Sequence, residues 1–174
     1  MVELREFAAA DVPLLMAWIA GPTELLTWAG PAFTWPLDES QLAEYAAESA
    51  TDRRRSWMGL ETDSGRVVGH ASLRIDAAVS SGRLGRVLVA PQARGRGYGT
   101  ALLEPVLTAA FEELRLDRVE LGVFDHNESA VRLYERLGFV VDRVLPDVER
   151  VDGRPWSALQ MVLEKSAWGR TAAG

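Results

Sequence analysis

The part of the sequence best suited to chemistry is a short segment rich in glycine and arginine. In the stretch VLVAPQARGRGYGTALL, three glycines and two arginines fall between residues 94 and 99. An apolar run typical of a strand precedes them, and one typical of a helix follows. The first turn of a helix carries unpaired N–H groups and partial positive charge, so it attracts anions. Glycines let a ligand approach those groups, and Arg94 and Arg96 can pair with phosphate oxygens. The segment therefore has the features of an anion-binding turn that a phosphate group could approach.

Two common phosphate-binding loops do not match this segment. The mononucleotide pattern GxxxxGK[ST] requires a lysine, and the segment contains none. The dinucleotide pattern GxGxxG requires a third glycine where the sequence has Thr100. Neither nucleotide class is supported, and a tight turn rich in glycine stays as the alternative.

Further residues of interest lie on predicted strands and helices. Asn127 is a typical N-cap, and Tyr134 follows seven residues later, about two helical turns, so both face the same way. Without further context, a tyrosine on a helix is more often a core residue. His70 lies on a predicted strand and is a candidate base, because an imidazole ordinarily titrates near neutral pH, but a lone histidine there is more often packed or solvated.

Strands and helices alternate along most of the chain. Short alternating or apolar runs predict strands at 2–7, 56–62, 66–75, 118–123 and from Val87, and a closing hairpin over 139–165. Apolar residues at helical spacing and capping residues predict helices at 11–19, 38–49, 97–114 and 127–138. Residues 21–36 read as a loop or a broken helix that carries aromatic residues. The pattern predicts an α/β or α+β fold with a single sheet.

Composition sets the broad class. The 174 residues suffice for one domain with a sizeable core, expected at 1–165, with 166–174 as a flexible tail. A net charge of −6 argues against nucleic-acid binding, and the absence of cysteine excludes thiolate metal sites and disulfides. The first residues do not resemble a secretory signal, and no run is long enough to span a membrane. We therefore expect a cytoplasmic protein.

Two motifs together resemble the GNAT superfamily of N-acetyltransferases. The first is R-x-x-G-x-G, read as Arg94, Gly97 and Gly99. The second is the stretch NESAVRLYERLGF at 127–139, which is similar to the family pattern N-x-x-A-x-x-L-Y-E-x-x-G-F. The resemblance implies a single mixed, mostly antiparallel sheet of about seven strands with helices on both faces. It also implies direct transfer of an acetyl group from acetyl-CoA to an amine, without a metal ion.

The resemblance also implies roles for individual residues. The diphosphate of acetyl-CoA would lie on the loop and helix start formed by Gly95, Arg96, Gly97, Tyr98, Gly99 and Thr100. Its pantetheine arm would pair as an added strand with Val87, Leu88 and Val89. Asn127 would contact this arm near the thioester, and Tyr134 would protonate the departing sulfur.

The base that deprotonates the amine is less well defined. Family members that acetylate protein amino termini often carry a glutamate where this chain has Gly122. Glu120 lies two residues earlier on the same face of the strand and could replace it. An exposed strand glutamate explains Glu120 equally well.

The acceptor region is expected around Trp28, Phe33 and Trp35, although a small aromatic cluster under a loop would look the same. These aromatics and the excess of acidic residues fit, weakly, a cationic small molecule or a peptide amine. The expected partners are acetyl-CoA and an amine, with no nucleic acid and no membrane. A homodimer is left open, because dimers are common in the family. The alternative function is an acyl-CoA-binding sensor of the same fold that does not transfer the acyl group.

Overall fold

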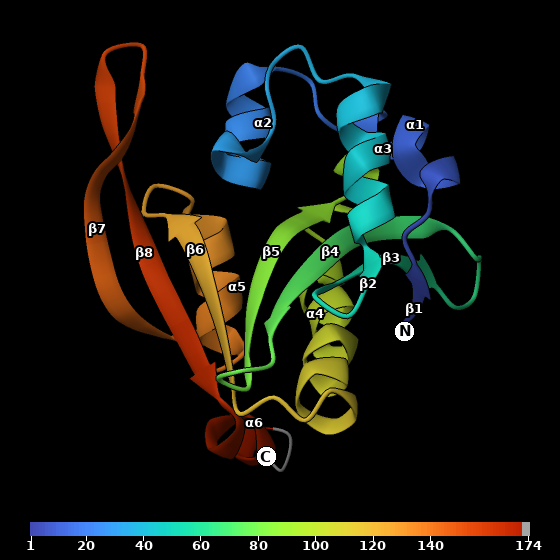
Figure 1. Cartoon of the computed structure of the whole chain (residues 1–174), viewed down its shortest axis with the longest axis vertical. Helices are drawn as coiled ribbons and strands as arrows, with labels where there is room; N and C mark the ends of the chain where they lie inside the picture. Colours follow the sequence, from blue (N-terminus) through green and yellow to red (C-terminus); the bar gives the residue numbers. More distant parts are fainter. Residues whose placement is uncertain (172–174) are drawn as a thin grey trace. The chain divides into compact units, whose positions relative to one another are not determined.

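A computed structural model describes residues 1–171 of the chain (Figure 1). The strands are β1 (Val2–Glu6), β2 (Ala50–Thr51), β3 (Arg54–Glu61), β4 (Val67–Asp76), β5 (Ser81–Val89), β6 (Arg118–Phe124), β7 (Val140–Val151) and β8 (Arg154–Glu164). The α-helices are α1 (Val12–Ala17), α2 (Pro22–Ala29), α3 (Glu39–Glu48), α4 (Tyr98–Thr108), α5 (Glu128–Arg136) and α6 (Lys165–Thr171). Short 3-10 helices occupy Ala9–Asp11, Gly30–Ala32 and Pro91–Ala93, and a π-helical segment occupies Ala109–Glu113.

The strands are hydrogen-bonded in the order β1-β3-β4-β5-β6-β8-β7, and β2 is added to β3. The pair β5–β6 is parallel, whereas β1–β3, β3–β4, β6–β8 and β7–β8 are antiparallel. The predicted mixed, mostly antiparallel sheet of about seven strands is therefore confirmed. The chain divides into two compact units, one formed by Met1–Ile75 with Leu84–Leu107 and the other by Asp76–Arg83 with the chain from Thr108 onward.

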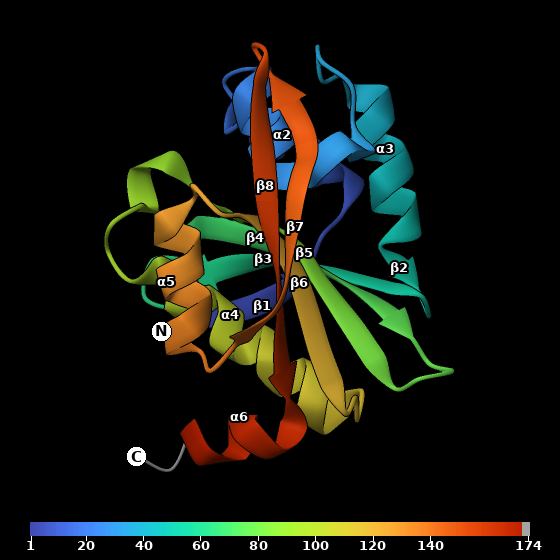
Figure 2. The ribbon, with the colours of Figure 1, turned by 90° about the vertical axis from the view of Figure 1, so that its left-hand side faces the viewer.

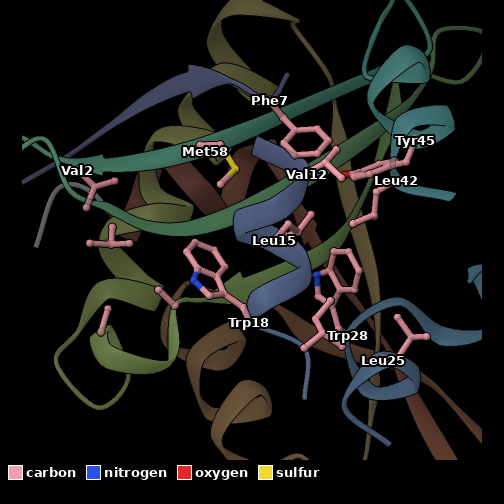
Figure 3. Close-up of a cluster of buried hydrophobic side chains, with 14 residues drawn as sticks. Val2, Phe7, Val12, Leu15, Trp18, Leu25, Trp28, Leu42, Tyr45 and Met58 are labelled. Atoms are coloured by element: carbon pink, nitrogen blue, oxygen red, sulfur yellow. The ribbon is translucent and has the colours of Figure 1, made fainter. Parts of the chain in front are cut away.

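In the first unit, helices pack on both faces of the sheet. Successive side chains of a strand point to opposite faces, so each face carries apolar side chains on which helices can pack. On one face, Met58 of β3 joins a buried core with Leu15 of α1 and Tyr45 of α3 (Figure 3). On the other face, Gly69 of β4 leaves room for Leu102 of α4. A Cβ atom at Gly69 would lie 2.8 Å from the Leu102 side chain, so the glycine allows the helix to pack closely.

In the second unit, β7 and β8 form a long antiparallel hairpin (Figure 2). The hairpin turns at Asp152 and Gly153, both of which have positive φ (48° and 76°), as a two-residue type I′ turn requires. This is the turn that the sequence VDGR predicts. Strand β8 pairs on its other edge with β6 along the whole length of β6.

Three segments differ from the sequence predictions. Strand β5 begins at Ser81, six residues before the predicted start, because the polar arginines at 83 and 86 hide the strand pattern. Residues 21–36 were expected to form either a loop or a broken helix, and they form a broken helix. Helix α2 starts at Pro22, because a proline in the first turn lacks only an N–H group that has no partner within the helix, and a 3-10 helix follows. Helix α6 occupies most of the segment that was expected to be a flexible tail, and residues 172–174 lie outside the described part.

Candidate active site

The glycine-rich segment links the end of β5 to the start of α4. Gly95 and Gly97 adopt positive φ (72° and 81°), and a Cβ atom at either position would meet no atom within 4 Å. Backbone conformation, rather than crowding within the protein, therefore requires glycine at both positions. The first helical hydrogen bond runs from the Ala101 N–H to the Gly97 carbonyl, at 3.2 Å. The N–H groups of 98–100 precede this ladder and lie at the positive end of α4.

The arginines and the tyrosine of this segment are held in different ways. The Nε of Arg94 donates to the carbonyl of Val89 at 3.2 Å, which ties the loop to the end of β5. The Tyr98 hydroxyl donates to the carboxylate of Glu61 at the end of β3. Arg94 and Arg96 are exposed, and neither forms an ion pair with any residue of 1–171. Their charge is therefore available to a ligand.

Strand β5 has one edge that is paired only at its beginning. Its parallel pairing with β6 covers Ser81–Arg83 and ends where Arg83 meets Glu120. On the β4 side, the N–H of Ala90 donates to the carbonyl of Val68 at 2.9 Å. Because strand amides alternate in direction, Leu88 also faces β4, while Val87 and Val89 face the opposite edge. The main-chain groups of those two residues lie on an edge that has no strand partner within the described chain.

Helix α5 is capped at both ends by the residues that the sequence indicated. The side chain of Asn127 accepts a hydrogen bond from the Ala130 N–H at 3.4 Å, so it is the N-cap. Gly138 has a φ of 95°, and its N–H donates to the Glu135 carbonyl at 3.0 Å. The Phe139 N–H donates to the Tyr134 carbonyl at 3.0 Å, which completes a Schellman motif.

This C-terminal cap positions the side chain of Tyr134. The apolar contact that accompanies a Schellman motif is made here by the rings of Tyr134 and Phe139, whose centroids are 5.8 Å apart. Tyr134 is buried, and this burial raises the pKa of its phenol well above the ordinary value. The hydroxyl therefore keeps its proton near neutral pH and can act only as a neutral donor or acceptor.

Glu120 is held by two side chains of the same unit. Its carboxylate lies 3.5 Å from Nη1 of Arg83 and 3.4 Å from Nε2 of Gln160, and its side chain is 28% exposed. A Cβ atom at Gly122 would lie 3.1 Å from Nη2 of Arg83. The arginine thus fills the space that a side chain at position 122 would need.

His70 lies in a setting that does not suit a base. It is fully buried, and its Nε2 lies 2.8 Å from the hydroxyl of Tyr45. Burial, followed by the positive charge of Arg86, lowers the pKa of His70 to about 3, while Asp11 and the Trp57 main chain act in the opposite direction. An imidazole with so low a pKa accepts protons poorly near neutral pH.

The aromatic residues expected at the acceptor region separate into two groups. Trp28 is buried and stacks on Phe33 with ring centroids 5.6 Å apart, whereas Trp35 is 44% exposed. Sequence reasoning missed two residues that join the first group, Tyr45 of α3 and Arg86 of β5. The guanidinium carbon of Arg86 lies 4.4 Å from the centroid of the Tyr45 ring and 5.1 Å from that of Phe33. An arginine inside the apolar run LGRVLV was the available signal.

Comparisons with known proteins identify the family. The sequence profile described as Acetyltransferase (GNAT) family matches residues 23–139, so the chain belongs to this family. The chain is also 31% identical over 140 residues to an uncharacterized N-acetyltransferase of Mycobacterium tuberculosis, with 80% of this chain and 83% of that protein covered.

Other relatives are matched over shorter stretches. A mycothiol acetyltransferase of Acidimicrobium ferrooxidans is 35% identical over 123 residues, which are 64% of this chain and 37% of that protein. A spermidine N(1)-acetyltransferase of Vibrio cholerae is 30% identical over 83 residues, or 48% of each. The chain thus spans half or less of the length of these two relatives.

The fold is that of solved acetyltransferases. The structure of the spermidine N-acetyltransferase from Vibrio cholerae in complex with CoA and spermine superimposes with a TM-score of 0.84, at 21% identity, and covers 96% of this chain and 97% of that one. Within residues 1–171, no helix is long and apolar enough to cross a membrane, and no group of three His, Asp or Glu residues could hold a metal ion.

The burial of His70 predicts a pH-dependent stability. Its pKa is about 3 in the folded chain and about 6.5 when unfolded, so the unfolded chain binds the proton more readily. The stability that this adds is present above pH 6.5 and is lost as the pH falls toward 3, by up to about 1.4 kcal/mol per pH unit. Urea unfolding should show that His70→Gln loses less stability than the wild type between pH 7 and pH 5.

The second histidine of the chain provides the control. His126 is exposed, so His126→Gln removes a histidine that is not buried and serves as the matched variant. An identical decline with pH in the wild type and in both variants would contradict a buried, neutral His70.

Proposed function

We propose that the chain is an acetyl-CoA-dependent N-acetyltransferase that transfers the acetyl group directly to a primary amine of a small molecule or of a protein. The observation that carries the proposal is the backbone of Gly95–Thr100 in a member of the GNAT family. Two left-handed glycines and three N–H groups ahead of the α4 hydrogen-bond ladder suit a diphosphate. Arg94 and Arg96 would neutralise its charge.

The main chain of β5 would hold the pantetheine arm. Val87 and Val89 direct their N–H and C=O groups to the edge without a strand partner, as strand addition requires, and the C=O of Val89 also accepts a hydrogen bond from Arg94. Leu88 faces β4 with its main chain, so it would contribute through its side chain alone. Asn127 would contact the arm with the polar atoms that its capping role leaves available.

In the proposed reaction, the nitrogen of the amine forms a bond to the thioester carbonyl carbon, and the carbon–sulfur bond breaks. The neutral phenol of Tyr134 would give its proton to the departing sulfur. Glu120 would take the proton that the amine loses, directly or through water, because burial makes His70 unsuitable. The products are the N-acetylated amine and CoA with a free thiol, and the chemistry needs no metal ion.

A second candidate is an acyl-CoA sensor without transferase activity. Gly122 favours it, because the glutamate that some relatives place there is replaced by a glycine covered by Arg83. Release of the CoA thiol on mixing acetyl-CoA with a panel of amines separates the two functions, since a sensor would bind acetyl-CoA and release none.

The glycine loop gives a binding prediction. Gly95→Ala should weaken CoA binding at least about tenfold, because the new methyl group disfavours the left-handed conformation and projects where the diphosphate would lie. Calorimetric titration with CoA measures this.

Gly65 provides a matched control for this change. It has a similar φ of 67°, and a Cβ atom there would also meet no atom within 4 Å. Gly65→Ala should therefore lose similar folding stability and bind CoA as the wild type does. Equal CoA affinity in both variants and the wild type would show that the glycine loop does not bind CoA.

The neutral phenol of Tyr134 predicts a selective loss of turnover. Tyr134→Phe should reduce kcat on the order of 100-fold while leaving the dissociation constant of acetyl-CoA nearly unchanged, because only proton donation is lost. Stopped-flow thiol release and calorimetry measure the two quantities separately. A variant that turns over at the wild-type rate would show that Tyr134 is only a core residue.

For Glu120, the prediction concerns the rate. Glu120→Gln should reduce kcat about 100-fold, because the group that takes the proton of the amine is lost. Glu164 is the matched control, because it is also a strand glutamate paired with an arginine, Arg118, at 3.1 Å. If Glu120→Gln behaves like Glu164→Gln, then Glu120 serves only to pair with Arg83.

A further inference from the structure

The first unit contains an arginine stacked among aromatic side chains, which the proposed function does not use. Arg86 lies in β5 with a positive φ of 51°, and its guanidinium packs on the rings of Tyr45 and Phe33. Trp28 stacks on Phe33, and Tyr45 is hydrogen-bonded to His70. We call these five residues the Arg86 cluster.

The charge of Arg86 is not neutralised within the described chain. Arg86 forms no ion pair with any residue of 1–171, although it is half-buried. The acidic groups that act on Arg54 and His70 are already paired: Glu48 lies 3.6 Å from Arg54, and Asp11 lies 2.7 Å from Arg5. A half-buried cation without a counter-ion is costly, so a site that retains one is suited to an anionic ligand.

The uncompensated charge also acts on its neighbours. After burial, which is the larger cause, Arg86 is the next cause that lowers the pKa of Arg54 and the pKa of His70. Both effects mean that this part of the protein carries a positive potential. An anion bound at Arg86 would relieve it, whereas a polycation would add to it.

Some polar atoms of the Arg86 cluster lack hydrogen-bond partners within the described chain. The rings of Phe33 and Tyr45 pack on the guanidinium, and a ring face is a poor hydrogen-bond acceptor for its N–H groups. Nε of Arg86 and Nε1 of Trp28 are buried and lack a hydrogen-bond partner among the described residues. Buried polar atoms without partners are rare in native proteins, and a bound ligand is one explanation for them.

From this we infer that Arg86 binds the anionic group of the amine acceptor, so that the substrate is an amine that also carries a carboxylate or a phosphate. The inference rests on the proposed function and narrows it. It reverses the expectation of a cationic acceptor drawn from the sequence. It also separates this chain from relatives named for spermidine, which is a polycation.

The test compares acceptors that differ only in the anion. Thiol release from acetyl-CoA is measured with a panel of α-amino acids, with the same amino acids as amides, with phosphoethanolamine and with spermidine. At least one amino acid or phosphoethanolamine should have a kcat/KM ten or more times that of its uncharged counterpart or of spermidine. Preference for the amino acids or for phosphoethanolamine identifies the anion as a carboxylate or a phosphate.

Variants of Arg86 test whether this residue causes the preference for anionic acceptors. Arg86→Gln should raise KM for the preferred anionic acceptor at least tenfold and leave its amide unaffected, and Arg86→Lys should fall between the two. Arg53→Gln removes the same charge from an exposed turn and should behave as the wild type. Equal use of acids and amides, a preference for spermidine, or an unchanged KM in Arg86→Gln would overturn the inference. If Arg86→Gln does not fold, Arg86→Lys carries the same test, and an unchanged KM in that variant would overturn the inference.

A binding measurement keeps this inference separate from the proposed function. If no amine releases thiol while CoA still binds, the transferase proposal fails. In that case, N-acetyl amino acids and their amides are titrated calorimetrically into the CoA-saturated wild-type protein and into Arg86→Gln. Carboxylate-selective binding that Arg86→Gln loses supports the anion site, and the absence of selectivity overturns it.

Discussion

The candidate site depends on the way strand β5 is paired. One edge of β5 is hydrogen-bonded to β4 up to the Ala90 N–H, and the other leaves β6 after Arg83. Beyond Arg83, the free main-chain groups of β5 lie only on the edge that faces away from β4. The strand then leads directly into the glycine turn and the start of α4. A strand edge, a nest of N–H groups and a helix dipole are thus arranged in sequence along one short piece of backbone. All three would contact the proposed ligand through the main chain.

This explains why much of the site could be predicted from the sequence. The residues that shape the backbone are local: Gly95 and Gly97 for the loop, and Asn127 and Gly138 for the two ends of α5. Each requires a residue type that a short window reveals. Most strands and the closing hairpin follow from apolar periodicity in the same way, whereas the mixed sheet was implied by the resemblance to the family.

The parts that could not be predicted depend on contacts between distant segments. The Arg86 cluster joins α2, α3, β4 and β5, and no window of sequence shows that an arginine from a strand stacks on a tyrosine about forty residues earlier. Glu120 appeared as an isolated strand residue, because its partners Arg83 and Gln160 lie about forty residues away on either side. The burial that makes His70 a poor base is likewise a tertiary property.

The edge strand β7 has a consequence for how the molecule can associate. It ends the sheet order, and Val140, Val144 and Val148 are exposed along it. Its register against β8 shifts twice, between Val141 and Arg143 and again between Leu145 and Glu149, where Pro146 removes one N–H group. In natural proteins, such irregularities in an edge strand prevent a strand of another molecule from extending the sheet. Two copies that met at β7 would therefore have to join through valine side chains rather than through a continuous intermolecular sheet.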